Sequence, residues 1–115
     1  MTNINIVNLT PHEIVMVGED DKVIIRYPSE GIARAVAMAQ PIGEVNGIPL
    51  VEMSYGEPCG LPEPVEGTCY IVSMLTAAAA AEYGRSVDDL LITADLVRDD
   101  HGNVVGCRKF SRYHK

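Results

Sequence analysis

The sequence predicts an α+β fold, in which a mostly antiparallel sheet, open or barrel-like, packs with one main helix that follows a buried strand. Three observations carry this prediction. Short β-rich runs alternate with turn signals, one alanine-rich run is a strong helix former, and the connections between runs are short and hairpin-like. A chain of 115 residues is long enough to form one domain, 1–115, with its own core.

The N-terminal part of the chain is predicted to form strands. The run "NINIVN" (3–8) alternates polar and apolar residues, which is typical of a half-buried strand. Two further apolar runs, "EIVMV" (13–17) and "KVIIRY" (22–27), are separated by the turn residues "GEDD". This arrangement predicts a β-hairpin.

The run "IARAVAMA" (32–39) fits two secondary structures. Its alanines favour a helix, whereas the flanking Pro28 and Pro41 and the strand-rich surroundings favour a strand. We predict a strand here, with a helix as the alternative.

Asn46 and Gly47 form the clearest turn signal in the chain, because both residues tolerate the positive φ of a type I′ turn. They predict that residues 36–45 pair with residues 48–55. The following run "GEPCGLPEPVEG" (56–67) holds three prolines and three glycines. Such a run favours neither a helix nor a ladder and predicts a rigid surface loop, of a length common in binding features and lids.

The main helix is predicted after the apolar run "TCYIV" (68–72), which is typical of a strand buried on both faces. The run "MLTAAAAAEY" (74–83) contains five consecutive alanines and predicts a helix. Ser73 is its expected N-cap, and Gly84 its expected C-terminal stop. The next run, "SVDDLLI" (86–92), is predicted to be a short turn.

A second hairpin and a basic tail are predicted at the C-terminus. The runs "DLVR" (95–98) and "VVGCRKF" (104–110) flank the turn residues "DDHGN". The last eight residues, "RKFSRYHK" (108–115), hold four of the nine Lys and Arg residues and no acid. We predict a solvated basic tail, with Arg108 alternatively available as a cation for an anionic ligand.

Charge and composition narrow the classes of partner. The net charge of −7 argues against a nucleic-acid partner. No apolar run reaches the roughly 18 residues of a membrane span, and the first residues lack a signal-peptide pattern. We therefore expect a cytoplasmic protein without a membrane partner. Three cysteines without a C-x-x-C spacing argue against a disulfide framework and against a cysteine zinc site.

Catalytic motifs do not stand out. The sequence contains no G-x-S-x-G, H-E-x-x-H, G-x-G-x-x-G or G-x-x-x-x-G-K-[ST] pattern. The acidic pairs 88–89 and 99–100 lie in predicted turns, where capping of backbone amides explains them. We therefore predict a protein that is not an enzyme and that uses neither a cofactor nor a metal.

Binding chemistry is better represented. The helix after Ser73 is expected to leave unpaired backbone amides at its N-terminus, where the helix dipole attracts a phosphate or carboxylate. The alternative is that Ser73 only caps the helix. Arg34 and Arg98 lie within apolar strand patterns. Each either faces water and pairs with an acid, or faces a pocket, where its planar guanidinium suits phosphate oxygens or a purine.

The run "NLTPH" places Pro11 and His12 at the central positions of a predicted turn. Asn8, Thr10 and His12 bring short polar groups to one end of the sheet, and a neutral imidazole donates, accepts and stacks on a base. The full set of predicted ligand-binding residues is Asn8, Thr10, His12, Arg34, Tyr70, Ser73 and Arg98.

The motifs "NLTPH", "GEVNGIPL", "YGE…GLPEP.EGT.YIVS" and "DLVRDDHGNVVGC" follow one another over nearly the whole chain. In this order they resemble a family of small bacteriophage and actinobacterial proteins. The resemblance implies a phage-associated protein of the host cytoplasm. By association, small phage proteins without enzymatic motifs are expected to be counter-defence factors.

Two functions from different classes are predicted. The first is a homo-oligomeric sponge that sequesters a cyclic or phosphorylated nucleotide immune signal. This function needs a pocket of locally positive potential in an otherwise acidic protein. The alternative is an acidic protein–protein inhibitor of a host defence effector. A small nucleotide hydrolase is a third and weaker hypothesis.

Overall fold

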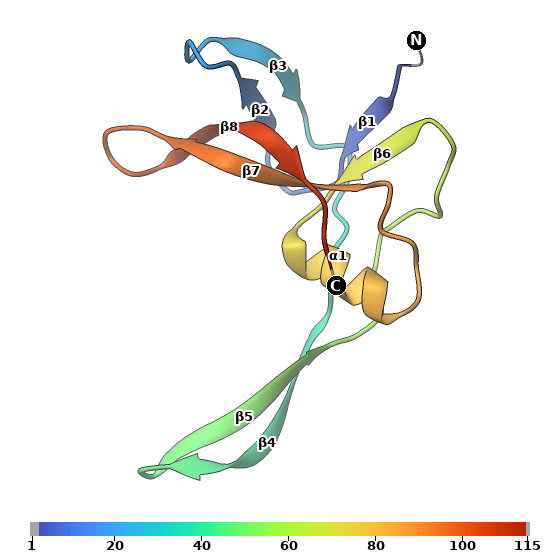
Figure 1. Cartoon of the computed structure of the whole chain (residues 1–115). Coiled ribbons are helices and arrows are strands. Elements are labelled where there is room, and N and C mark those ends of the chain that lie inside the picture. The colour runs from blue at the N-terminus through green and yellow to red at the C-terminus, as the bar shows by residue number, and fades with distance from the viewer. Residues whose placement is uncertain (1–2, 115) are drawn as a thin grey trace.

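The structure is a computed structural model that describes residues 3–114 (Figure 1). Its elements in chain order are β1 (Asn5–Asn8), β2 (Ile14–Val17), β3 (Val23–Tyr27), β4 (Ala37–Val45), β5 (Ile48–Tyr55), β6 (Thr68–Ile71), α1 (Met74–Glu82), β7 (Leu90–Arg98) and β8 (Val104–Ser111). The predicted α+β class with one main helix after a buried strand is confirmed.

The strands form one sheet of six, in the order β1-β6-β7-β8-β2-β3, and a separate pair, β4-β5. The ladders β2–β3, β7–β8 and β4–β5 are antiparallel, while β1–β6, β6–β7 and β2–β8 are parallel. The antiparallel ladders hold most of the paired residues, so the predicted mostly antiparallel arrangement is confirmed. The barrel-like alternative is not realised within residues 3–114, because the outer strands β1 and β3 meet only next to an isolated bridge between Asn8 and Ser29.

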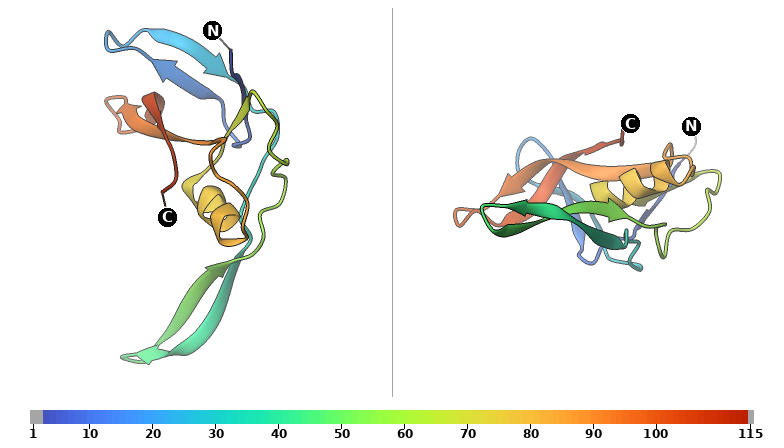
Figure 2. Two further views of the ribbon diagram at one scale, coloured as in Figure 1. Left: turned by 45° about the vertical axis from the view of Figure 1, so that its right-hand side comes forward. Right: turned by 90° about the horizontal axis from the view of Figure 1, so that it is seen from below.

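The core lies between α1 and the strands beside it (Figures 1 and 2). Its buried cluster consists of Leu9, Ala33, Tyr70, Val72, Ala77, Ala80, Leu90 and Ile92. Ala77 and Ala80 have no exposed surface, and their small side chains let the helix approach its neighbours closely. The helix begins after the N-cap Ser73 and is followed by Gly84 at φ +83°, as the sequence predicts.

Two predicted boundaries are wrong. The strand predicted at 32–39 starts only at Ala37, and residues 32–36 form no regular element apart from one bridge between Arg34 and Cys59. The turn predicted at 86–92 is shorter, because Leu90 is fully buried beside Tyr70 of β6 and already belongs to β7. In both places tertiary pairing sets the boundary, overriding local preference.

The strand predicted at 104–110 is confirmed, and β8 continues to Ser111, so the first four residues of the predicted basic tail at 108–115 belong to the sheet. Arg108 donates hydrogen bonds to the carbonyl of Gly18 and to the carboxylate of Asp21. The hydrogen bond to Asp21 raises the pKa of Arg108 above its ordinary value. Arg108 therefore joins β8 to the β2–β3 turn and is not a free cation for a ligand.

The β4–β5 hairpin projects away from the rest of the molecule, and we call it the arm (residues 37–55; Figures 1 and 2). Asn46 and Gly47 have φ values of 54° and 80°, which confirms the predicted type I′ turn at its tip. The arm makes the molecule elongated. Its principal extents are 54 × 39 × 23 Å and its radius of gyration is 16.8 Å, against about 13 Å for a compact chain of about 100 residues.

The seam between β2 and β8 is the narrowest part of the six-stranded sheet. A single residue pair, Met16 with Cys107, joins the two strands. Next to it, a Cβ added at the buried Gly106 would lie 2.5 Å from Val17 Cγ2 and 3.0 Å from the carbonyl oxygen of Val15. The seam therefore requires a residue without a side chain at position 106.

We expect Gly106→Ala to lower the free energy of unfolding by about 2 kcal/mol, because the added methyl group forces β2 and β8 apart. Urea denaturation followed by circular dichroism measures this change. Gly56→Ala is the matched control, since a Cβ there meets its neighbours at 3.8 Å or more. A Gly106→Ala protein as stable as the control would contradict the tight seam.

Candidate functional site

A cavity of about 330 Å³ lies beside the start of α1. Three segments build it: the loop after β1, the segment before β4 and the N-cap of α1. The lining residues are Leu9, Thr10, Pro11, Ile32, Ala33, Arg34 and Ser73. We call it the Arg34 cavity.

The Arg34 cavity has a positive local charge in an acidic protein. Arg34 is its one charged lining residue, and no carboxylate lines it. The backbone of Arg34 is held by two hydrogen bonds with Cys59, of 3.0 and 2.9 Å, so the position of the residue is fixed. Its guanidinium forms no ion pair within residues 3–114 and is exposed. It is therefore free to bind an anion.

The start of α1 is open to solvent beside the cavity. Ser73 Oγ accepts a 3.2 Å hydrogen bond from the Thr76 amide, and the buried Thr76 hydroxyl donates to the carbonyl of Ala33. The preceding amides of Met74 and Leu75 donate to no group in the described part of the chain, and their side chains are 61% and 51% exposed. Free amides at a helix N-terminus attract anions.

The loop at one wall of the cavity is shaped by Asn8, which is fully buried. Its amide Nδ2 donates to the carbonyls of His12 and Tyr27, at 2.7 and 2.8 Å. Its Oδ1 accepts from the amide and hydroxyl of Thr10, at 2.9 and 2.7 Å. Each polar atom of the Asn8 side chain is thus used inside the protein, and Asn8 positions the wall without contacting the cavity.

Of the seven residues predicted from the sequence, the structure brings Thr10, Arg34 and Ser73 together around one cavity. The other four, Asn8, His12, Tyr70 and Arg98, are not among its lining residues.

These four residues have other surroundings. His12 is exposed, and Tyr70 is 6% exposed within the core. Arg98 donates a 2.9 Å hydrogen bond to the carbonyl of Gly102 in the β7–β8 turn, far from α1.

The apolar lining of the Arg34 cavity, in particular Leu9 and Ile32, was not predicted from the sequence. Leu9 follows a polar residue in a predicted turn, and Ile32 lies in a segment predicted as an ordinary strand. One signal was present in the sequence. Ile32 follows Gly31 and lies two residues before Arg34, so this segment does not alternate regularly between polar and apolar residues. Long-range contacts decide which of these side chains line a cavity, so local patterns do not reveal them.

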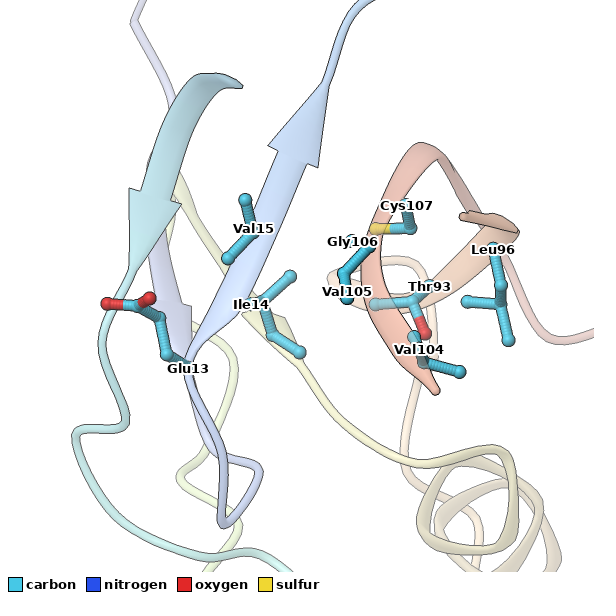
Figure 3. A pocket seen from close by; sticks show the side chains of 9 residues that line it. All are labelled: Glu13, Ile14, Val15, Thr93, Leu96, Val104, Val105, Gly106 and Cys107. Carbon is cyan, nitrogen blue, oxygen red and sulfur yellow. The ribbon is translucent and has the colours of Figure 1, made fainter. Parts of the chain in front are cut away.

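Two further cavities have no unpaired cation among their lining residues. The first, about 100 Å³, lies between β2 and β8 and is mainly apolar (Figure 3). Burial raises the pKa of the Cys107 thiol at its edge, so this thiol stays protonated. The second, about 270 Å³, is lined by Glu57 and Glu63, and its Arg85 is held by Asp89 at 2.8 and 2.9 Å.

No family model, curated protein or solved structure matches the chain. Residues 3–114 contain no group of three or more His, Cys, Asp or Glu side chains placed to hold a metal ion. No helix in the same range is both long and apolar enough to cross a membrane. The Arg34 cavity is therefore interpreted from its own geometry.

We expect Asn8→Asp to lower the free energy of unfolding by about 3 kcal/mol. The oxygen that replaces Nδ2 would face the carbonyl oxygens of His12 and Tyr27 without a donor, while the other oxygen keeps the Thr10 donors, and a buried charge that is only half satisfied is costly. Urea denaturation measures the change, and Asn3→Asp at an exposed position is the matched control. Equal stability of the two variants would show that the Asn8 hydrogen bonds do not hold the loop.

Proposed function

We propose that this protein binds a small phosphorylated nucleotide in the Arg34 cavity and sequesters it without changing it chemically. The observation that carries the proposal is the position of one unpaired cation beside an open helix N-terminus, in a cavity without lining carboxylates. Arg34 and the N-cap Ser73 line the same cavity, and the two free amides directly follow Ser73 in the chain.

The chemistry of the walls suits the parts of a nucleotide. The Arg34 guanidinium would bind phosphate oxygens through two parallel hydrogen bonds, and the amides of Met74 and Leu75 would add two more donors. The apolar side chains of Leu9 and Ile32 would contact the base. A volume of about 330 Å³ lies within the range of small-molecule sites, roughly 300 to 1,000 Å³.

The resemblance to small phage proteins supports a particular class of nucleotide, the cyclic nucleotides that act as immune signals. A phage-encoded sponge in the host cytoplasm would lower the free concentration of such a signal through affinity and abundance alone. This role requires no catalytic group, and a homo-oligomer would present several sites per particle.

We expect a cyclic nucleotide to bind the wild-type protein in isothermal titration calorimetry against a panel of cyclic dinucleotides and cyclic ADP-ribose isomers. Arg34→Ala should weaken that binding about 10- to 100-fold, because it removes charge-assisted hydrogen bonds to phosphate. Arg98→Ala is the matched control and should bind as the wild type does, since Arg98 is outside the cavity.

Three measurements separate the three functions: the nucleotide titrations, binding to a basic host protein at varied salt, and product analysis by chromatography. No heat and no thermal shift across the whole panel would overturn the nucleotide proposal. An acidic inhibitor would instead bind a basic host protein, with an affinity that falls steeply with salt and does not change in Arg34→Ala. A hydrolase would release a product that chromatography detects after incubation.

Ser73 allows the capping role to be separated from the ligand role. Ser73→Asp should keep the helix cap and the stability, because aspartate is as good an N-cap as serine. It should weaken nucleotide binding at least about 10-fold, because a carboxylate then faces the phosphate. Ser73→Ala should lower the free energy of unfolding by about 1 kcal/mol. Unchanged binding in Ser73→Asp would place the ligand elsewhere.

A further inference from the structure

The arm exposes an unusual amount of apolar side chain. All its strand residues are exposed except the half-buried Tyr55, and its charged residues are two carboxylates, Glu44 and Glu52. The large apolar side chains of the arm and its base are between 43% and 68% exposed: Val36, Met38, Ile42, Val45, Ile48, Leu50, Val51 and Met53. A hairpin that stays in water has one polar face, so this composition indicates a covered surface.

The strand register shows how these side chains are distributed over the two faces. One face carries the pairs Ala37–Tyr55, Ala39–Met53 and Pro41–Val51 and, beyond the irregularity between Pro41 and Gly43, the pair Glu44–Pro49 near the tip. The opposite face carries Met38–Ser54, Gln40–Glu52, Gly43–Leu50 and Val45–Ile48. Large apolar side chains therefore lie on both faces, with one carboxylate on each, and a partner has to cover both faces to remove these side chains from water.

The edges of the arm are less suited to contact than its faces. Pro41 and Pro49 place a residue without an N–H donor on each strand, which discourages the addition of a further strand. A two-stranded hairpin on its own is marginally stable in water. Contact through the two faces of the arm supplies the missing stability without pairing at its edges.

We infer that a second copy of this chain covers the arm, in a two-fold dimer in which each copy donates its arm and receives that of its partner. Surface area supports this occupant. Summed over both faces of the arm and its base, the eight large side chains expose about 700 Å² per copy, close to the roughly 800 Å² that each partner buries in a stable interface. Two-fold symmetry adds the surface that receives the arm.

The body of the chain itself carries a matching surface. Six large apolar side chains on β3, β7 and β8 are between 43% and 70% exposed: Val23, Ile24, Ile25, Leu96, Val104 and Val105. Three of them belong to β7 and β8, beside the apolar cavity of Figure 3. The body thus offers exposed apolar side chains that match those of the arm.

Sedimentation velocity of the full chain without ligand tests the dimer. Over concentrations from about 1 to about 100 µM, the wild type should sediment with twice the monomer mass of 12.5 kDa. Val51→Lys places a charge among the apolar side chains of its face, between Met53 and Pro49, and should raise the dissociation constant at least about 100-fold. Val65→Lys is the matched control, since Val65 is exposed in the 56–67 loop outside the arm, and it should remain dimeric.

A monomeric wild type at the highest concentration would overturn the inference and point to a different protein as the partner. A dimeric Val51→Lys would also overturn it. If that variant does not fold, Met53→Lys on the same face decides in its place. The inference goes beyond the proposed function, because the experiment uses no nucleotide and its failure leaves the ligand proposal standing.

Discussion

The structure depends on one buried amide, the side chain of Asn8, and on the backbone around it. Two of its four hydrogen bonds connect the end of β1 with the carbonyl groups of His12, before β2, and of Tyr27, at the end of β3, and the other two are accepted from Thr10. The neighbouring backbone adds bonds from Leu9 to Ile71 and from Ala33 to Leu9, at 3.0 and 2.9 Å. Segments that are distant in sequence meet at this point, and the wall of the Arg34 cavity is made of these same segments. A cavity built this way is preorganised, so little ordering is required when a ligand enters.

The base of the arm adjoins the wall of the cavity along the chain, because Val36 lies two residues after Arg34. Arg34 is bridged to Cys59, and the Gly56 amide donates to the carbonyl of Val36 at 2.8 Å, so both ends of the arm are fixed next to the cavity. Gly60, at φ +79°, lies so close to the carbonyl of Ile32 that a side chain there would collide with it. Any tilt of the arm on docking must therefore displace the cavity wall. By linkage, a ligand that prefers one position of the wall shifts dimerisation, and dimerisation shifts ligand affinity by the same factor.

Local signals in the sequence predicted the elements whose physics is local. Asn46-Gly47 identified the arm's turn, and Ser73 with Gly84 identified both ends of the helix. Boundaries set by distant partners were missed: Leu90 enters β7 because it packs beside β6, and Arg108 is held by the β2–β3 turn. The candidate site follows the same division. The chemistry of Arg34 and Ser73 was visible in their residue types, whereas their meeting at one cavity arises from the Asn8 crossing point, which no local pattern encodes.

The acidic charge of the protein is compatible with an anionic ligand because of where the charges lie. Clusters of carboxylates occupy the turns of the β2–β3 and β7–β8 hairpins, whose tips lie away from α1 (Figures 1 and 2). At physiological salt, exposed charges are largely screened beyond about 8 Å, so these carboxylates act weakly on an anion beside α1. In the proposed complex, Arg34 and the free amides of α1 would act at contact distance, where screening is small. Short-range attraction would then outweigh long-range repulsion, and the repulsion would slow the approach of the ligand more than it would weaken the complex.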